Sequence, residues 1–243
     1  TSQSIQPILA AGHSLGEYTA LIISEMLSFE EGLNLVRKRG QLMSQFGDGS
    51  MLAMPLEQDE AMGIAERYNC QVATINLAKQ TVIGGTDQDI DLCQNACTEL
   101  FPKKRTVKLD TEGAFHTDLM KKAADEFMND LNQAQFTLSK LKVLSNFTTD
   151  IHKKDGSLTK ELLFQQLYRP VNWLGCMKSS IAFDIDTIVE FGGGIGIGKS
   201  PAEKRPNLES ITKKNFRGFG QEIKYCSAIN TESIEESVKY LTQ

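Results

Sequence analysis

The spacing of apolar residues along the chain alternates between two patterns, one that predicts strands and one that predicts helices. Short continuous apolar runs are typical of strands in a sheet that is covered on both faces, and apolar residues three and four positions apart are typical of amphipathic helices. Residues 8–11 form such a run, and a helix-compatible segment follows at residues 18–26. Strands that alternate with helices in this way predict an α/β fold.

The segment between residues 48 and 108 has a pattern of its own. It follows the turn cluster Gly47-Asp48-Gly49-Ser50, and such clusters mark boundaries between elements. Its apolar positions predict the order β-α-β-β-α-β, which is typical of a ferredoxin-like unit. The predicted elements are residues 51–56, 59–68, 70–76, 80–84, 87–101 and 105–109. We therefore predict a ferredoxin-like insert at residues 48–108, in a larger domain formed by residues 1–47 and 109–243.

The larger domain is predicted to contain a long helix that begins at a capping box. Ser28 and Glu31 have capping-box spacing, and the helix should run to about Phe46. Arg39 lies among apolar residues on one face of this helix, where a charge needs an anionic partner. Its interpretation stays open between a structural ion pair and a fork that binds a substrate carboxylate.

Beyond the insert, the pattern predicts further alternation of strands and helices. The predicted helices are residues 118–132, 158–168, 173–183 and 232–241, and the predicted strands are residues 142–146, 187–191 and 224–228. Residues 148–156 are predicted to form a surface loop with a solvated His152. Residues 200–220 are basic and interrupted by Pro201 and Pro206, which predicts a mobile segment.

Candidate chemistry lies at the first predicted turn from strand to helix. Residues 12–16 read Gly-His-Ser-Leu-Gly, the pattern of a nucleophile elbow in the strand–turn–helix context that this motif requires. Ser14 would be held at the tip of a sharp turn, with Gly12 and Gly16 leaving room for the neighbouring backbone. The backbone N–H of Leu15 would point to the oxyanion that forms on an attacked carbonyl. We therefore predict an α/β fold in which a hydrolase-like parallel-sheet domain carries the ferredoxin-like α+β insert.

A serine nucleophile needs a general base, and the chain contains three histidines. His13 adjoins Ser14, but a sharp turn directs neighbouring side chains apart. His152 lies in the lysine-rich predicted loop. His116 lies where the insert returns the chain to the larger domain, and elimination leaves it as the candidate base. Spacing does not identify the group that orients its imidazole, because a backbone carbonyl would serve as well as an aspartate.

Two other motifs offer competing chemistry. Residues 193–200 fit the phosphate-binding pattern G-x-x-x-x-G-K-[ST], but prolines follow instead of the helix that a phosphate loop requires. We interpret these residues as a flexible loop near the active site. Asp48-Gly49 resembles the Asp-Gly of patatin-like lipases, which use a Ser–Asp dyad, although here it directly follows a helix at a domain boundary.

Amino-acid composition and net charge limit the kinds of partner that this protein is expected to bind. The net charge of −5 argues against a nucleic-acid partner, because nucleic-acid-binding surfaces are usually basic. No apolar run has the length that spans a bilayer and no signal peptide is visible, so no membrane partner is predicted. The five cysteines have the spacing of neither a disulfide framework nor a zinc site, which predicts a cytoplasmic setting and no metal.

Three motifs together resemble the malonyl-CoA:acyl-carrier-protein transacylase family, which includes the acyltransferase domains of polyketide synthases. They are the elbow string, Val36-Arg37-Lys38-Arg39-Gly40 and Gly113-Ala114-Phe115-His116, and they occur in the family's order around an insert in the expected place. The resemblance covers the chain to about Phe191. It implies an enzyme of fatty acid or polyketide synthesis that moves a malonyl group from coenzyme A to the phosphopantetheine thiol of an acyl carrier protein. Malonyl-CoA would be a substrate, and no cofactor would be needed.

The resemblance also implies roles for single residues. The family's nucleophile and base match Ser14 and His116, and its carboxylate-binding arginine matches Arg39. The backbone carbonyl that orients its histidine belongs to a glutamine before Leu-Tyr-x-Pro-Val-x-Trp, which matches Gln166. The remaining matches are His13, which would help to position the substrate carboxylate, Asn76 in the hairpin of the insert, and Phe115, whose bulk would leave little room for an α-methyl branch.

The sequence departs from the family's pattern at two places. The family's Gly-Gln-Gly-Ser-Gln motif, which supplies a second oxyanion N–H, is not among the 243 residues. The loop after Phe191 is richer in glycine and lysine than the family's usual Gly-Pro-Gly turn. Two alternatives stand beside acyl transfer. One is an editing hydrolase of the same fold that acts on acyl carrier proteins, and the other, which the missing motif supports, is a truncated, non-catalytic module that docks on a carrier protein.

Overall fold

The computed structural model describes residues 5–153, 155–196, 198, 200 and 203–242. The chain forms two compact units. The larger unit is Leu9–Cys176, which contains the elbow, all three histidines and the insert. The smaller unit comprises Met177–Gln243 together with the residues up to Ile8.

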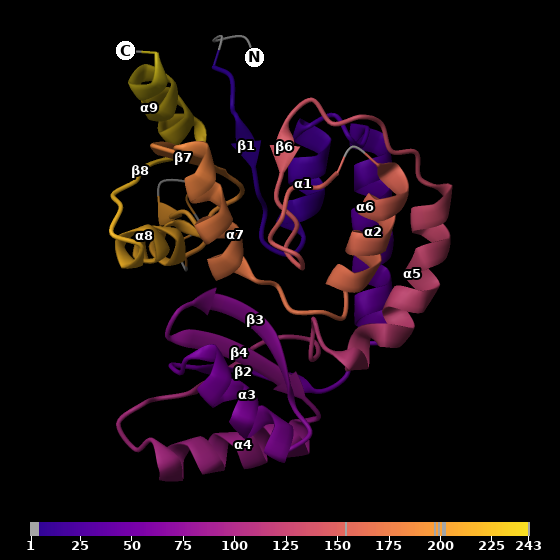
Figure 1. The fold of residues 1–243 in the computed structure, drawn as a ribbon, viewed down its shortest axis with the longest axis vertical. Coiled ribbons are helices and arrows are strands. Elements are labelled where there is room, and N and C mark those ends of the chain that lie inside the picture. Colours follow the sequence, from indigo (N-terminus) through magenta and orange to yellow (C-terminus); the bar gives the residue numbers. More distant parts are fainter. Residues whose placement is uncertain (1–4, 154, 197, 199, 201–202, 243) are drawn as a thin grey trace. The chain divides into compact units, whose positions relative to one another are not determined.

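The larger unit contains a short parallel sheet and a group of helices. Strand β1 (Leu9–Ala10) pairs in parallel with β6 (Lys142–Val143), which requires a crossover connection between them. A 3₁₀ turn, η1 (Asp118–Met120), leads into the crossover helix that follows the insert. The helices are α1 (Gly16–Ile23), α2 (Phe29–Gln45), α5 (Lys121–Gln133), α6 (Gly156–Gln166) and α7 (Trp173–Ser180), whose end lies in the smaller unit. Helix α5 packs against both α2 and α6, as Figure 1 shows.

Helix α2 is capped and buried as the sequence predicts. Ser28 Oγ accepts the N–H of Glu31 at 3.1 Å, and the helix ends one residue before Phe46. Leu35, Leu42 and other apolar side chains of one face join the core that α1, α5 and α6 also line. Arg39 projects from the same face, and only 4% of its surface is exposed. The amphipathic pattern therefore places a guanidinium inside the unit.

The insert has the predicted ferredoxin-like topology. Its elements are β2 (Ser50–Met54), α3 (Gln58–Arg67), β3 (Gln71–Leu77), β4 (Gln80–Gly85), α4 (Asp87–Leu100) and β5 (Val107–Leu109). The antiparallel sheet has the strand order β3-β4-β2-β5, and α3 and α4 lie on one face of it (Figure 1). The segment after α6 joins its edge, because Ile75 N–H donates to Val171 O at 2.9 Å and Val171 N–H donates to Ala73 O at 3.0 Å.

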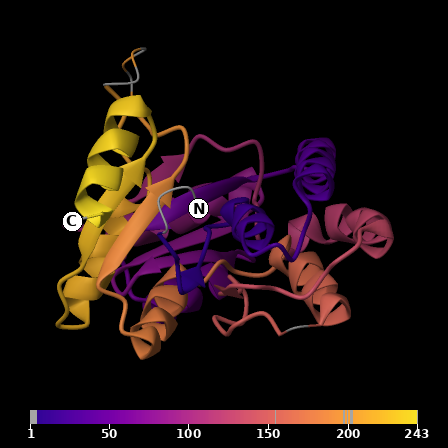
Figure 2. The same ribbon diagram turned by 90° about the horizontal axis from the view of Figure 1, so that it is seen from above.

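The smaller unit contains a second parallel pair of strands, β7 (Thr187–Phe191) and β8 (Lys224–Ala228). Helix α9 (Thr231–Leu241) packs on β8, as the yellow and orange elements of Figure 2 show. Most residues of strand β7 are only half-buried, and Phe191 is 66% exposed. A short 3₁₀ turn, η2 (Ile181–Phe183), follows α7.

The prediction of a mobile segment at residues 200–220 was wrong over its second half. Residues 209–218 form helix α8 (Glu209–Gly218), which begins beyond both prolines. The carboxylate of Glu190, at the end of β7, accepts the N–H groups of Asn207 and Leu208 at 2.7 and 3.0 Å. A side chain distant in the sequence therefore binds the two N–H groups that directly precede this helix. Residues 201 and 202 lie outside the described residues.

In the part of the chain that the structure describes, none of the helices is long and apolar enough to cross a bilayer.

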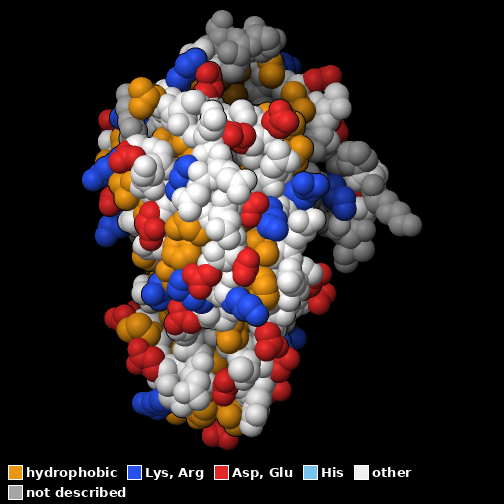
Figure 3. Space-filling model, turned by 90° about the vertical axis from the view of Figure 1, so that its right-hand side faces the viewer, with side chains coloured by type: hydrophobic (Ala, Val, Ile, Leu, Met, Phe, Trp, Pro, Cys, Tyr) orange, Lys and Arg blue, Asp and Glu red, His pale blue; other side chains and the backbone are white. Residues whose placement is uncertain are grey.

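On the face that Figure 3 shows, acidic and basic side chains are interspersed, so this face carries no large field of one sign.

Candidate active site

Ser14 lies in the turn between β1 and α1, in a strained backbone conformation. Its φ of 52° is in the left-handed region, which residues other than glycine rarely adopt. A Cβ at Gly12 would lie 1.9 Å from Gly16 O, so the sharp turn requires glycine at position 12. A Cβ at Gly16 would meet no described atom within 4 Å. The prediction that Gly16 is needed to leave room was therefore wrong.

His116 comes from the loop that follows the insert, and it contacts the serine directly. Ser14 Oγ and His116 Nε2 are 2.8 Å apart, and His116 Nδ1 is 2.7 Å from the backbone oxygen of Gln166. A carbonyl can only accept, so Nδ1 carries the proton and Nε2 is left to accept the serine O–H. His116 also has a positive φ, 61°, so both members of the pair are held in strained conformations.

The surroundings of His116 favour its neutral form. Burial, assisted by the positive charge of Arg39, lowers the pKa of His116 to about 3, against an ordinary value of 6.5. The hydrogen bond to the carbonyl of Gln166 raises the pKa, but it is the weaker influence. At neutral pH the imidazole is therefore unprotonated and can take a proton from Ser14.

Arg39 reaches the serine from helix α2. Its Nη2 donates to Ser14 Oγ at 3.0 Å and to Gln166 Oε1 at 3.3 Å. Burial lowers the pKa of the Arg39 guanidinium. Among the described residues, no carboxylate lies within ion-pair distance of this guanidinium. Its buried Nε also lacks a hydrogen-bond acceptor within the described chain. The sequence left two interpretations of Arg39 open, and the structure does not show the first of them, a structural ion pair.

Gln166, at the end of α6, uses both its backbone and its side chain. The carbonyl holds His116, while Nε2 donates to Ser14 O at 2.8 Å and to Glu17 Oε2 at 2.9 Å. Leu15 N–H follows the nucleophile at the start of α1 and has no acceptor among the described residues. That N–H is in the position where an elbow donates to an oxyanion.

The other residues implied by the resemblance also lie in the larger unit. His13 Nε2 contacts Asn76 Oδ1 at 2.9 Å, and its ring lies 5.7 Å from that of Trp173. The sharp turn thus directs His13 to Asn76 of the insert, and burial lowers the pKa of His13. Phe115 packs against the cores of both the helical part and the insert.

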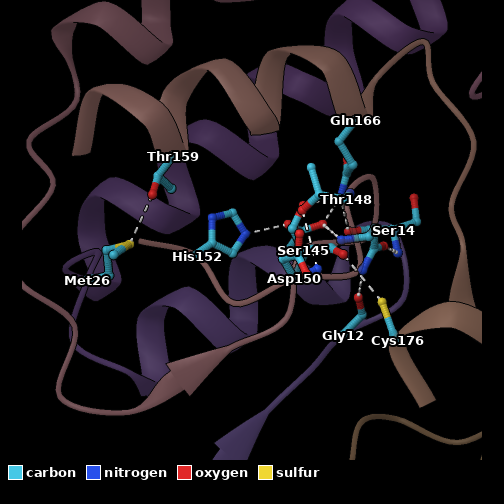
Figure 4. A network of polar contacts seen from close by, with 12 residues as sticks. Gly12, Ser14, Met26, Ser145, Thr148, Asp150, His152, Thr159, Gln166 and Cys176 are labelled. Carbon is cyan, nitrogen blue, oxygen red and sulfur yellow. Dashed lines mark hydrogen bonds and ion pairs between the residues drawn. The ribbon is translucent and has the colours of Figure 1, made fainter. Parts of the chain in front are cut away.

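Sequence reasoning missed the polar network beneath the elbow, which Figure 4 shows in part. Ser14 N–H donates to Asn146 Oδ1 at 2.6 Å, and Asn146 Nδ2 donates to Gly12 O at 2.7 Å. The prediction of a solvated His152 was wrong, because its ring is buried with Nε2 2.7 Å from Glu17 Oε1. The only signal in the sequence was Glu17 itself, which follows the G-x-S-x-G pattern directly.

The competing motifs do not supply a second centre in the described residues. The next α-helix among the described residues after the motif at residues 193–200 is α8, which begins only at Glu209, whereas a phosphate loop opens directly into a helix. Residues 197 and 199 of that loop lie outside the described residues, and its place near the active site stays a prediction. Asp48 accepts the N–H of Gly49, and the hydroxyl of Ser14 instead contacts His116 and Arg39. No group of three His, Cys, Asp or Glu side chains among the described residues could hold a metal.

Comparisons with known proteins agree with this geometry. A family model described as the acyl transferase domain matches residues 1–191. The malonyl CoA-acyl carrier protein transacylase of Bacillus subtilis (strain 168) is 35% identical over 199 residues, which are 78% of this chain and 62% of that protein. The chain thus spans less than two thirds of that curated relative.

Solved structures show the same fold. The malonyl CoA-acyl carrier protein transacylase from Coxiella burnetii aligns with a TM-score of 0.86 and 28% identity, over 100% of this chain and 74% of that one. A malonyl-transacylase in complex with its type II polyketide synthase acyl-carrier protein aligns with a TM-score of 0.84 and 25% identity, over 97% of this chain and 74% of that one.

Proposed function

Because the chain belongs to the acyl transferase domain family, we propose that it transfers a malonyl group from coenzyme A to the phosphopantetheine thiol of an acyl carrier protein. The single observation that carries this proposal is the line of contacts from Arg39 through Ser14 and His116 to the carbonyl of Gln166. The names of the relatives and the complex of one of them with a carrier protein support the choice of substrate and partner.

In the first half of the reaction, Ser14 Oγ attacks the thioester carbon of malonyl-CoA and His116 Nε2 takes the serine proton. The N–H of Leu15 donates to the oxyanion. The carbon–sulfur bond then breaks, and His116 returns the proton to the sulfur of coenzyme A. The malonyl group is left as an ester on Ser14, and Nδ1–H of the neutral imidazole stays on the Gln166 carbonyl.

In the second half, the phosphopantetheine thiol gives its proton to His116 and attacks the ester carbon. The ester bond to Ser14 breaks, and Oγ regains a proton from the imidazolium. Arg39 would bind the free carboxylate of the malonyl group, since a guanidinium binds carboxylates bidentately and its Nε has no other acceptor here. His13 and Asn76, already joined to each other, would position the same end of the substrate.

Every group to which the proposed transfer assigns a role is a side chain or a backbone group, so we propose that it needs no metal or redox cofactor. We also place it in the cytoplasm. In support, all five cysteines are free thiols, and structural disulfides are rare in that compartment.

Labelled malonyl-CoA tests the proposal. The intact protein should carry the label on Ser14, the Ser14→Ala variant should carry none, and added carrier protein should collect the label as a thioester. Release to water in preference to the carrier would instead favour the editing hydrolase, and an unlabelled Ser14 would favour the docking module. The assembled Ser14–His116 pair argues against a module without chemistry.

A further inference from the structure

Glu17 lies beneath the elbow, in the first turn of α1, and its side chain is fully buried. Its Oε1 contacts His152 Nε2 at 2.7 Å, and its Oε2 accepts Gln166 Nε2–H at 2.9 Å and Asn146 N–H at 3.1 Å. The two amide groups can only donate, so the carboxylate is held here as an acceptor. A carboxylate is retained in such a place only where donors surround it, because burial of an unpaired charge is costly.

The amide of Gln166 is fixed between an acceptor and a donor. Its Nε2 faces the carboxylate of Glu17, which can only accept, and its Oε1 faces Nη2 of Arg39, which can only donate. A rotation of the amide by half a turn would set NH₂ against guanidinium and oxygen against carboxylate. Glu17, together with the backbone oxygen of Ser14 that accepts from the same Nε2 at 2.8 Å, therefore fixes which end of the amide meets Arg39.

We propose that Glu17 is a positioning residue for the proposed transfer: through Gln166 it holds the guanidinium of Arg39 in the orientation that selects acyl groups with a free carboxylate. The inference rests on the proposed function, because it assigns Arg39 to the substrate carboxylate. The same carboxylate also holds Asn146, whose side chain binds the N–H of Ser14.

His152 completes the arrangement from the loop after β6. Among the described residues, Glu17 is the one side-chain hydrogen-bond partner of its ring, and its buried Nδ1 has none. Since an ionised carboxylate can only accept, His152 Nε2 donates to Oε1. This bond leaves Oε2 to Gln166 and Asn146, and Figure 4 shows His152 directed toward the network around Ser14 and Gln166.

The test compares second-order rates of Ser14 acylation by malonyl-CoA and by acetyl-CoA. In the Glu17→Gln variant an amide NH₂ replaces one acceptor oxygen and the charge is lost. We expect the malonyl-to-acetyl ratio to fall roughly tenfold or more, the effect of losing a hydrogen bond to a charged group. A loss that is merely structural would lower both rates alike. An unchanged ratio overturns the inference.

The matched control is Glu31→Gln. Glu31 also lies in the first turn of a helix and also accepts a backbone N–H, that of Gln135 at 2.8 Å, but it lies outside the network. We expect this variant to keep the wild-type ratio. A ratio that fell equally in both variants would assign the effect to general loss of helix-terminal charge and would overturn the role given to Glu17.

Two substitutions of His152 carry the test if Glu17→Gln fails to fold. His152→Gln keeps an N–H donor for Glu17 and should keep the ratio, whereas His152→Leu removes the donor and should lower it. If the malonyl-to-acetyl ratio is the same in His152→Gln and His152→Leu, the inference is overturned. The proposed function fails separately: if the wild-type protein takes no malonyl group onto Ser14, the transfer itself is refuted, whereas a labelled wild type with an unchanged ratio in the variants refutes only the role of Glu17.

Discussion

The depressed pKa of His116 predicts that Ser14 stays reactive in mild acid. A histidine with the ordinary pKa of 6.5 would be only about 3% neutral at pH 5, so a reaction that needs the neutral ring would slow about thirtyfold between pH 8 and pH 5. With the pKa at about 3, the ring of His116 is almost wholly neutral at pH 5. The sign follows from burial, which disfavours the imidazolium and so extends the neutral form to lower pH.

A neutral fluorophosphonate that modifies Ser14 is the suitable probe, because it has no carboxylate to titrate or to bind to Arg39. We expect its second-order labelling rate to vary less than twofold between pH 5 and pH 8, with fluorescence measured at each pH to show that the protein stays folded. The Arg39→Gln variant should keep this flat profile, because burial is the larger cause of the shift. A midpoint near pH 6.5 in the wild-type protein would refute the reasoning.

Four further substitutions follow from the site. Arg39→Ala should lower the ratio of kcat/KM for malonyl-CoA to that for acetyl-CoA by about ten- to a hundredfold, the effect of a lost charge-assisted hydrogen bond; equal losses for both substrates would contradict its role. Gly12→Ala should prevent folding or destabilise the protein strongly, because its Cβ would lie 1.9 Å from a backbone oxygen. Gly16→Ala should be neutral or stabilise by up to about 1 kcal/mol in urea denaturation, since it adds a good helix former in open space. If both glycine variants lose the same stability, the geometry of the turn is misassigned. Asn146→Leu should cost about 1–3 kcal/mol in the same assay, because it leaves the partly buried N–H of Ser14 unpaired, and wild-type stability would contradict this.

The sequence was sufficient where the signal is local or where few candidates exist. The capped start of α2 follows from Ser28 and Glu31, three residues apart, and the ferredoxin-like order follows from periodicity within one segment. Ser14 was identifiable because its strand, turn and helix are contiguous. His116 was identifiable by elimination among only three histidines, and the structure places it 2.8 Å from the serine.

His116 was selected by elimination, and one premise of that elimination, that His152 is solvated, was wrong. Adjacent lysines made His152 look solvated, yet its ring is buried against Glu17, a residue 135 positions away in the sequence. Glu17 itself has the pattern of an ordinary acidic residue in the first turn of a helix, which is normally exposed to solvent. The burial of His152 and of Glu17 could not be predicted without knowing which segment of the chain packs over α1.

What the sequence by itself determined is therefore the set of elements and the reactive pair, because hydrophobic period, capping and turn chemistry act over a few residues. Only the tertiary structure decided which polar groups share a buried space. It put Glu190 rather than a local residue at the start of α8, and it put a carboxylate, an amide and an imidazole beneath Ser14. The physical reason is that a buried polar group must find its partner through space, and distance along the chain carries no information about that partner.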